Sequence, residues 1–219
     1  MKILITGAAS GIGLGCVKAF AQHQVTGIDR TEVDLSHICE VQKYCETLES
    51  FDAMIYCAGV REIEEPTALS YSMWEKVLNV NVNANFLISQ KLIKNALAKN
   101  QKLSIINISS VSGFQAEPNR AAYVTAKHAV IGLSRQLGFQ YARQGVRVNV
   151  IAPGIIETPM TASYFKDSMM AQKICTAIPT GKWGQVENLT PLIENCLHNE
   201  YLNGSVLVCD GGWTIGRDL

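Results

Sequence analysis

Three side chains near the middle of the chain have the types and spacing of an acid/base redox site. Tyr123 and Lys127 lie four residues apart in a stretch of helical periodicity, and Ser110 stands thirteen residues before the tyrosine. Residues four apart share one face of a helix, so the ammonium can lie beside the phenol and lower its pKa from about 10. We therefore expect Tyr123 to act as the general acid/base and Ser110 to donate to the substrate oxygen.

A glycine-rich loop follows an apolar strand at 2–6 and opens a helix at 11–22. This context is typical of a loop that binds a dinucleotide. Gly7 allows a sharp turn, Gly11 lets the backbone approach the pyrophosphate, and Gly13 lets the helix pack closely. Unpaired N–H groups at the start of the helix would face the phosphates. The cofactor contacts predicted in this loop are Gly7, Ala9, Ser10, Gly11, Ile12 and Gly13.

Asp29 follows the second predicted strand, at 24–28, where the adenosine ribose of a dinucleotide would lie. Its carboxylate can accept hydrogen bonds from the ribose diol and would repel a 2′-phosphate. Two unit charges about 4 Å apart at an effective dielectric constant of 20 interact by about 4 kcal/mol, before solvent screening. Arg30 could instead pair with a 2′-phosphate, but the glycine-rich loop contains no basic residue. We therefore expect NAD as the cofactor, with NADP less favoured.

The elements that must position these residues alternate along the chain as short apolar strands and longer helical segments. This alternation predicts a single α/β domain over 1–219, with a Rossmann-like, doubly wound parallel sheet of about seven strands. The extended region at 152–185 has no predicted strand and is rich in Met, Tyr and Phe, so residues 155–185 are a candidate substrate lid. The predicted strands are 2–6, 24–28, 52–57, 103–109, 146–151 and 205–209, and the predicted helices are 11–22, 37–50, 71–99, 120–142 and 186–198.

The composition is that of a globular enzyme. The chain has 219 residues, of which 47% are hydrophobic, and its 19 basic and 19 acidic residues leave no net charge to favour nucleic acid or an anionic membrane. The seven cysteines are odd in number and lack a Cys-x-x-Cys pair, so we expect reduced, buried thiols and no metal site. The first strand begins at Lys2, leaving no room for a targeting leader, and no apolar run approaches a bilayer span. We expect a cytoplasmic protein.

Six short motifs occur in one order along the chain. They are TGAASGIG at 6–13, CAG at 57–59, NVN at 79–81, NISS at 107–110, YVTAK at 123–127 and PGIIET at 153–158. With this ordered set the sequence resembles the short-chain dehydrogenases/reductases, from residue 2 to Trp213. The resemblance implies a single-domain, NAD(P)-dependent oxidoreductase that acts on a hydroxyl or a ketone.

The resemblance also implies roles for further residues. Lys127 would hold the hydroxyls of the nicotinamide ribose, and Asn81 would support a water chain that returns protons to Lys127. Asp34, followed by Leu35, matches an aspartate that meets the adenine amino group. Backbone at Ile156 and the hydroxyl of Thr158 would fix which face of the nicotinamide is presented. The remaining cofactor contacts that we expect are Arg30, Cys57, Ala58, Gly59, Pro153 and Gly154.

Two features depart from the family's pattern. Asp29 is followed almost at once by Val33-Asp34-Leu35, so we expect a helix and a strand to be reduced after the second strand. Cys57 stands where the family usually has asparagine, which would affect local bracing of the strand rather than the chemistry.

Two alternative functions are less favoured than that of an NAD-dependent oxidoreductase. An NADPH-dependent 3-ketoacyl-carrier-protein reductase is disfavoured by Asp29, by the neutral glycine-rich loop and by the acidic segment 61–65, because carrier docking would need positive charge. A non-catalytic dinucleotide sensor on the same fold would commonly have lost Tyr123 or Lys127, and this chain keeps both.

The substrate is the least determined property. Segments 112–115 and 160–174 should form its walls, and their apolar and aromatic residues suit a small to medium alcohol or ketone. No arginine is expected in this pocket, since Arg120 lies at a helix start and Arg61 on another loop.

Assembly is predicted from apolar residues on the long helices 71–99 and 120–142, which face more directions than one sheet can cover. With the tail 204–213, these faces lead us to expect a homotetramer, or a homodimer as the fallback, in line with the family. The apolar residues are Leu87, Leu92, Leu97, Leu133 and Leu137.

Overall fold

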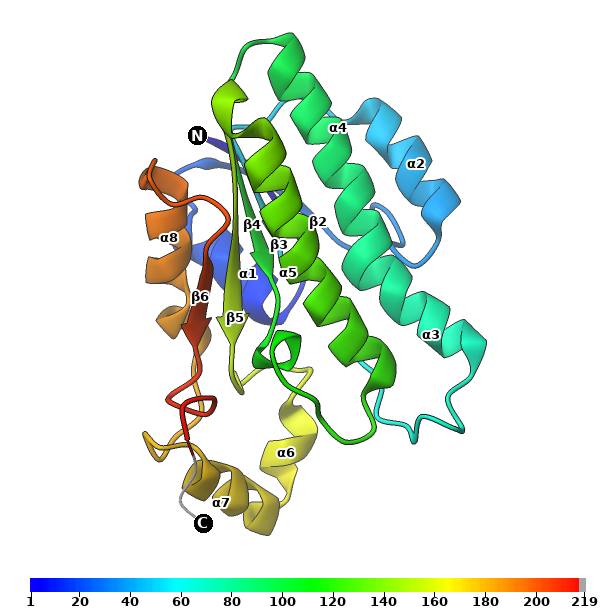
Figure 1. Ribbon diagram of the computed structural model, residues 1–219, viewed down its shortest axis with the longest axis vertical. Helices are drawn as coiled ribbons and strands as arrows, with labels where there is room; N and C mark the ends of the chain where they lie inside the picture. The colour runs from blue at the N-terminus through cyan, green and yellow to red at the C-terminus, as the bar shows by residue number, and fades with distance from the viewer. Residues whose placement is uncertain (217–219) are drawn as a thin grey trace.

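A single parallel sheet lies between two layers of helices in the computed structural model, which describes residues 1–216 (Figure 1). The strand order is β2-β1-β3-β4-β5-β6, and every neighbouring pair is parallel. The strands are β1 Lys2–Thr6, β2 Gln24–Ile28, β3 Ala53–Tyr56, β4 Leu103–Ile108, β5 Val146–Pro153 and β6 Val206–Cys209. The helices are α1 Gly11–Ala19, α2 Ile38–Thr47, α3 Tyr71–Leu78, α4 Ala84–Ala98, α5 Ala121–Tyr141, α6 Ala162–Lys166, α7 Ser168–Ala177 and α8 Thr190–His198.

The expected α/β fold is confirmed, but the described residues form six strands rather than about seven. The difference lies after β2, where the backbone N–H of Val33 donates to Asp29 O and that of His37 donates to Asp34 O. These turns lead straight into α2 without a further strand. The shortening expected after the second strand therefore leaves β2 as the edge of the sheet.

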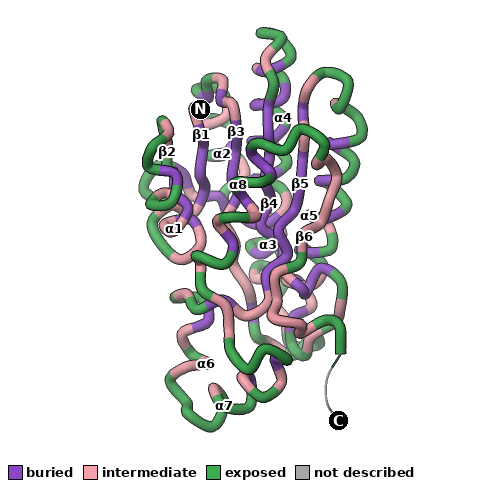
Figure 2. Tube along the Cα trace, turned by 90° about the vertical axis from the view of Figure 1, so that its left-hand side faces the viewer, coloured by how far each residue is buried: buried purple, intermediate pink, exposed green. Residues whose placement is uncertain are grey.

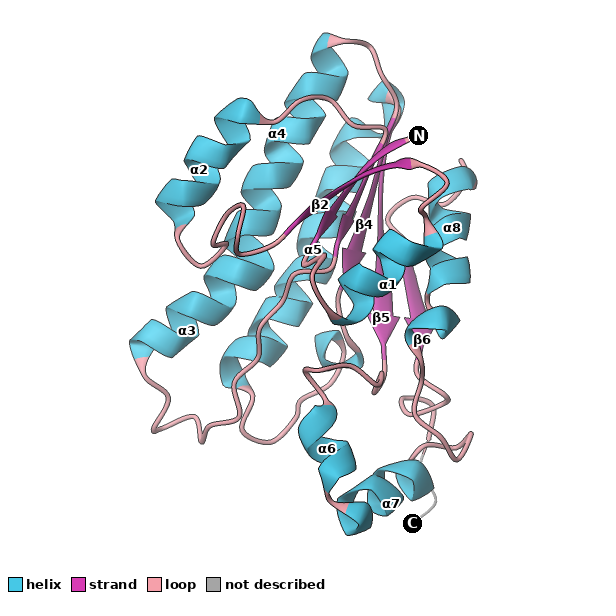
Figure 3. Cartoon of the chain, turned by 180° about the vertical axis from the view of Figure 1, so that it is seen from behind, coloured by secondary structure: helices cyan, strands magenta, loops and turns pink. Residues whose placement is uncertain are grey.

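Side chains of successive strand residues enter two separate cores, as the alternation of a strand requires. Leu4 belongs to the core beneath α2, α4 and α5, whereas Ile3 and Ile5 belong to the core beneath α1 and α8. Figure 3 shows α1 and α8 together on one face of the sheet. The four inner strands, β1, β3, β4 and β5, are buried almost throughout, whereas the edge strands β2 and β6 are only partly buried (Figure 2).

The helix predicted over 71–99 is interrupted by a π-helical turn at Asn79–Asn83. Within this turn, Asn81 Nδ2 donates to the carbonyl of Val77 at 2.9 Å and to that of Val60 at 2.8 Å. Such turns are frequent at functional sites because they redirect a side chain within a helix. The interruption aims Asn81 at the loop that follows β3.

The region at 152–185 contains the short helices α6 and α7, which lie beyond the carboxyl end of the sheet (Figure 3). One isolated bridge joins Ile156 to Gly184, and Asp167 caps α7 by accepting from the N–H groups of Met169 and Met170. After β5 ends at Pro153, the region has no strand, as predicted.

The seven cysteines are free, and their burial differs from the expectation. Cys16 and Cys196 are buried, whereas Cys39 is exposed because it lies on the solvent side of α2. Across residues 1–216, no helix is long and apolar enough to cross a bilayer. The same part of the chain contains no cluster of His, Cys, Asp or Glu that could hold a metal ion.

Candidate active site

Two adjoining cavities open at the carboxyl ends of the strands. The chain leaves β1 toward β2 and then crosses back to β3, and such a switch point is where open parallel sheets bind ligands. One cavity of about 330 Å³ and a second of about 450 Å³ share Gly59, so they form one continuous site. Among the predicted site residues, the smaller cavity is lined by Gly7, Ala9, Ser10, Asp29, Arg30, Asp34, Leu35, Ala58 and Gly59. The larger is lined by Ile12, Cys57, Gly59, Ser110, Tyr123, Lys127, Pro153, Gly154, Ile156 and Thr158.

The glycine-rich loop has the backbone that the sequence predicted. Gly7 and Gly11 have φ angles of 67° and 52°, a region that favours glycine. A Cβ atom on Gly13 would lie 2.1 Å from Gly7 O, so α1 packs directly against the turn. Ser10, the N-cap of α1, makes no side-chain capping bond. The residues present thus fit a pyrophosphate, because backbone N–H groups at a helix start remain available to an anion.

Several carboxylates lie at the smaller cavity or beside it. Asp29 Oδ1 accepts from the backbone and side chain of Thr31, which holds the pKa of Asp29 below its ordinary value. Glu32 Oε2 accepts from the backbone N–H of Asp29 at 2.9 Å and adds a second negative charge beside it. Sequence reasoning missed Glu32, although its position three residues after Asp29 was a usable signal. Asp34 Oδ1 accepts from Ser36, whose bonds lower the pKa of Asp34.

Ser110, Tyr123 and Lys127 meet at the wall of the larger cavity. The Lys127 ammonium lies 5.4 Å from the centre of the Tyr123 ring, and it donates to Ile108 O at 3.0 Å. Lys127 is only 5% exposed, and this burial lowers its pKa to about 8. The helical spacing therefore brings the two side chains together as expected.

The pKa of Tyr123 differs from the expectation, because burial raises it above its ordinary value. A hydrogen bond with Ser110 opposes this rise, and so do the charges of Arg61 and Arg120. In the protein without cofactor, desolvation of the phenolate therefore outweighs the neighbouring donors and cations.

Asn81 and Lys127 both lie against the backbone at Gly59. A Cβ atom on Gly59 would lie 3.0 Å from Asn81 Oδ1 and 3.6 Å from Lys127 Nζ. Asn81 does not line either cavity, and its buried Oδ1 has no hydrogen-bond partner in the described part of the chain. The thiols of Cys57 and Cys16, both free, form a hydrogen bond, and this bond together with burial raises the pKa of Cys57.

Glu62 holds the start of α5, the helix that carries Tyr123. Its carboxylate accepts from the backbone N–H of Ala122 at 2.7 Å and from that of Tyr123 at 3.1 Å, and the residue is 4% exposed. A carboxylate at this end of a helix pairs with unsatisfied N–H groups and with the positive end of the helix dipole. The acidic segment 61–65 is therefore not simply a surface patch, and Glu62 was missed by sequence reasoning.

The segment after β5 closes the floor of the larger cavity. The backbone N–H of Thr158 donates to Thr161 Oγ1 at 3.0 Å, and Ile156 is buried. A Cβ atom on Gly11 would lie 3.4 Å from Thr158 Cβ, so this segment packs against the glycine-rich loop. The two regions predicted to contact the cofactor are thus adjacent.

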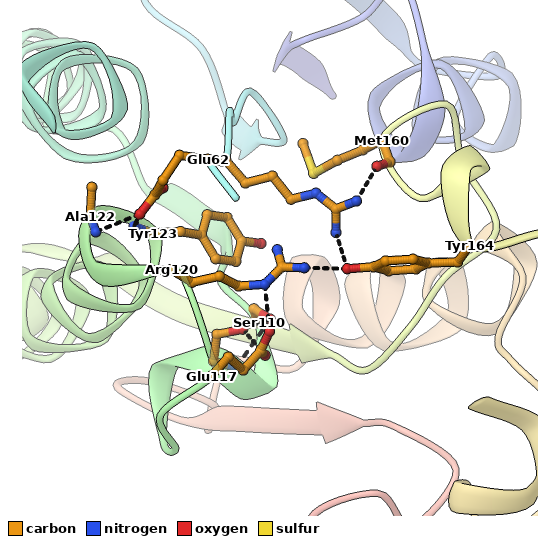
Figure 4. Close-up of polar contacts among 10 residues, drawn as sticks. Glu62, Ser110, Glu117, Arg120, Ala122, Tyr123, Met160 and Tyr164 are labelled. Atoms are coloured by element: carbon orange, nitrogen blue, oxygen red, sulfur yellow. Dashed lines mark hydrogen bonds and ion pairs between the residues drawn. The ribbon is translucent and has the colours of Figure 1, made fainter. Parts of the chain in front are cut away.

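Two arginines line the larger cavity, contrary to the expectation (Figure 4). Arg61 reaches it from the loop after β3, and Arg120 from the residue before α5. Both guanidinium groups donate to the hydroxyl of Tyr164 on α6. No local pattern indicates this meeting, because it depends on how three separate segments fold over the sheet.

Of the segments predicted to form the walls of the substrate pocket, only some residues line the larger cavity. Ser112, Gln115, Met160, Tyr164, Met170 and Ile174 line the larger cavity. Phe114 is instead 45% exposed, and Phe165 packs against Trp183 with the two rings tilted and their centroids 4.4 Å apart. Met169 is 68% exposed, while Trp213, at the end of the tail 204–213, lines the cavity.

The chain is similar to known proteins over nearly its whole length. A model of the enoyl-(acyl carrier protein) reductase family matches residues 28–214. The chain is 31% identical over 241 residues to 2-dehydro-3-deoxy-D-gluconate 5-dehydrogenase of Bacillus subtilis (strain 168), covering 96% of this chain and 93% of that protein. A structure of 4-hydroxyisoleucine dehydrogenase complexed with NADH matches with a TM-score of 0.92 and 35% identity over 99% of both chains. A proposed 2-deoxy-D-gluconate 3-dehydrogenase from Agrobacterium tumefaciens with bound NADP matches with a TM-score of 0.89 and 27% identity, covering 98% of this chain and 96% of that one.

These matches agree with the doubly wound sheet and with the groups that meet at its carboxyl edge. The class is that of α/β oxidoreductases that use a nicotinamide dinucleotide. Within it, the chain belongs to the short-chain dehydrogenase/reductase family, as the resemblance implied. The expected reaction class, hydride transfer between a nicotinamide and a secondary alcohol or ketone, is confirmed.

Proposed function

We propose that the chain is an NAD-dependent dehydrogenase in which Tyr123 is the acid/base and Ser110, Lys127 and Asn81 assist it. The observation that carries this proposal is the meeting of Ser110, Tyr123 and Lys127 at one cavity, directly beside the segment after β5. The nicotinamide, when bound, supplies the hydride acceptor for oxidation and the hydride donor for reduction.

The reaction requires a proton to leave the alcohol oxygen during oxidation. Tyr123 Oη takes this proton from the substrate hydroxyl and returns it in the reverse direction. Ser110 Oγ donates a hydrogen bond to the same oxygen, which favours the negative charge that develops there. The raised pKa of Tyr123 keeps the phenol protonated at neutral pH, so the proton for ketone reduction is present, and nearby positive charge is needed to make the group a base for oxidation.

Lys127 and Asn81 provide the route by which this proton reaches solvent. The lowered pKa of Lys127, about 8, allows its ammonium to release and recover a proton near neutral pH. The unpaired Asn81 Oδ1 is a buried acceptor close to Gly59 and the lysine, and such an atom calls for a water partner. A water held there would connect Lys127 to bulk solvent.

NAD is proposed rather than NADP because of the charges at the end of β2. Asp29 and Glu32 stand side by side through the Glu32 bond to the Asp29 backbone, and both would repel a 2′-phosphate. Arg30 also lines the smaller cavity, but it is exposed, and none of the hydrogen bonds described for residues 1–216 fixes its guanidinium there. With two carboxylates and one guanidinium, this end of the site has a net negative charge. That charge favours the ribose diol of NAD over the 2′-phosphate of NADP.

We also propose that residues 155–185 act as the substrate lid. Met160, Tyr164, Met170 and Ile174 in this region line the larger cavity, so its movement would admit substrate and exclude water. A cytoplasmic homotetramer, or a homodimer, remains our expectation for the assembled enzyme.

The direct test is the Tyr123→Phe variant, assayed by nicotinamide absorbance with a panel of secondary alcohols and ketones. We expect turnover to fall at least about a hundredfold, the lower range for loss of a general acid/base, while NAD affinity stays nearly the same. Tyr141→Phe, at the far end of the same helix, is the matched control. Retained turnover in Tyr123→Phe would remove the tyrosine from its role.

The same panel tests the 3-ketoacyl-carrier-protein reductase alternative. A ketoacyl thioester of pantetheine with NADPH is the diagnostic substrate. Preference for it over every small alcohol and ketone would establish the alternative. Tight NAD binding without turnover of any substrate would instead favour the sensor.

A further inference from the structure

Two guanidinium groups converge on one neutral oxygen inside the larger cavity. Arg61 Nη1 donates to Tyr164 Oη at 3.0 Å, and the Arg61 guanidinium also stacks on the tyrosine ring, 4.8 Å from its centre. Arg120 donates to the same hydroxyl (Figure 4). Three separate segments, namely the loop after β3, the start of α5 and α6, therefore place two positive charges at a single point.

The carboxylates near this point are already engaged. Glu117 is paired with Arg120 Nε at 3.0 Å and accepts from Ser112 Oγ, and it is the one acidic residue among those that line the larger cavity in residues 1–216. Glu62 accepts from the backbone at the start of α5. The bonds described for Arg61 go only to neutral oxygens, the Tyr164 hydroxyl and the carbonyl of Met160.

This arrangement leaves the lining with an excess of positive charge. Arg61, Arg120 and Lys127 face the cavity against Glu117 alone. Arg120 is 7% exposed, so its charge is poorly screened by water. A guanidinium presents a planar set of donors that matches a carboxylate, and two of them around one cavity favour an anion there.

The arginines are also close to the reacting groups. Both act electrostatically on the Tyr123 phenol, and Arg120 is three residues from Tyr123 along the chain. An anion held by them would therefore lie a short distance from the oxygen that exchanges a proton with Tyr123. The cavity of about 450 Å³ is shared with residues expected to contact the nicotinamide, which leaves room only for a small substrate.

We infer that the substrate is a short hydroxy acid, or the matching keto acid, whose carboxylate binds between Arg61 and Arg120 beside the Tyr164 hydroxyl. This inference rests on the proposed function of the same cavity. In oxidation, the carbinol carbon gives its hydride to NAD⁺ and the hydroxyl proton goes to Tyr123, so the products are the keto acid and NADH. The carboxylate is unchanged and serves as the handle that orients the substrate.

The first test measures binding without turnover. Butyrate and its neutral analogue butyramide are titrated by calorimetry into the full-length enzyme saturated with NADH. We expect butyrate to bind at least about tenfold more tightly than butyramide, and Arg61→Met to remove at least about tenfold of its affinity. Arg143→Met, an exposed arginine beyond the end of α5, is the matched control and should leave butyrate binding unchanged.

The second test measures specificity. Short 2-, 3- and 4-hydroxy acids and their primary amides are compared by kcat/KM with NAD. We expect the best acid to exceed its amide at least about tenfold, and this ratio to fall toward unity in Arg61→Met. Arg120→Lys, which keeps a cation for Glu117, should raise KM for the acid more than it lowers kcat.

The outcomes separate the two proposals. Equal binding of butyrate and butyramide, or no butyrate binding up to about 50 mM, overturns the carboxylate site. Turnover of the amides as fast as the acids also overturns it, yet leaves the dehydrogenase proposal standing. Preferred binding of butyrate with no turnover of any alcohol would refute the proposed function while retaining the anion site.

Discussion

The ammonium of Lys127 is buried, and its burial makes the free energy of unfolding depend on pH. Its pKa is about 8 in the folded protein because burial penalises the cation, and it returns to its ordinary value of 10.5 on unfolding. Between these values the unfolded chain binds more protons than the folded one, so the free energy of unfolding rises with pH. Below about pH 8 the folded protein bears the full cost of the buried ammonium.

We therefore predict that the stability difference between the wild type and Lys127→Met shifts in favour of the wild type from pH 8 to pH 9.5. The slope cannot exceed about 1.4 kcal/mol per pH unit, the value for one proton. Urea unfolding of both proteins without cofactor at several pH values measures it. A difference that stays flat over this range would mean that Lys127 keeps its ordinary pKa.

Asp29 decides the cofactor in our proposal, and Glu32 supports it. We predict that Asp29→Ala narrows or reverses the preference for NAD, because repulsion of a 2′-phosphate is reduced and Arg30 can pair with it. The change in the ratio of kcat/KM for the two cofactors should be about tenfold or more. The double variant Asp29→Ala/Glu32→Ala should shift the ratio further.

The ratio of kcat/KM for NAD and NADP in the wild type also tests the cofactor proposal. An enzyme that already prefers NADP would show that Arg30 outweighs both carboxylates. Glu46→Ala, a change of an exposed acid on α2, controls for the general loss of negative charge.

At the scale of elements, α5 positions Tyr123 only if its first turn is fixed. Arg120, the N-cap residue, makes no side-chain capping bond, and Glu62 supplies the missing acceptor from a distant loop. We predict that Glu62→Gln lowers the free energy of unfolding by about 1–3 kcal/mol, because a charged acceptor is replaced by a neutral amide. Urea unfolding measures this loss.

The positioning role adds a second expectation for the same variant. Turnover of Glu62→Gln should fall while NAD affinity remains close to that of the wild type, since Tyr123 shifts but the glycine-rich loop does not. Glu46→Gln serves as the control for loss of a carboxylate. A variant with lower stability but wild-type kcat would show that Glu62 stabilises the fold without positioning the tyrosine.

The start of α1 depends on a close approach of Gly13 to the backbone of Gly7. We predict that Gly13→Ala abolishes tight dinucleotide binding, since the added Cβ would lie 2.1 Å from Gly7 O and the loop must move. Gly132→Ala in α5 is the matched control, because its Cβ meets no atom within 4 Å. That control should be neutral or should stabilise the helix by up to about 1 kcal/mol. Calorimetric titration with NADH compares the two.

At the scale of the whole molecule, the outer surface of the helical layer bears on assembly. Leu92 and Leu137 are buried in the core, and Leu87 and Leu133 pack against it, so of the five leucines only Leu97, 39% exposed, is open to a partner as expected. Phe139 on α5 is 82% exposed, and an exposed aromatic side chain of this size is a further candidate interface residue. The prediction of an oligomer thus rests on Leu97 and Phe139 rather than on the other four leucines.

We predict that the wild type is a tetramer or dimer and that Phe139→Glu shifts it toward smaller species. Light scattering after size-exclusion chromatography at micromolar concentration measures the mass of each. Tyr201→Glu changes another fully exposed aromatic residue and should leave the mass unchanged. A monomeric wild type would contradict the prediction of an oligomer.

The sequence by itself determined the features that depend on neighbouring residues. The spacing of Tyr123 and Lys127 gave one helix face, and the glycines after the first strand gave the turn into α1, because local periodicity and backbone freedom act within a few residues. Strand positions followed from short apolar runs for the same reason. The interruption of the helix at Asn79–Asn83 was not predicted, and Asn81 within it donates to Val60 in another segment, a contact that no local pattern shows.

Only the tertiary structure decided which distant loops share the site. Arg61 and Tyr164 are 103 residues apart, and Glu62 is 61 residues from Tyr123, yet each pair is joined by a hydrogen bond. No periodicity relates such residues, because their meeting is set by the order of the strands and by the packing of the loops over the carboxyl edge. The sequence therefore determined the reaction class, whereas the charge of the substrate pocket emerged only when the chain was folded.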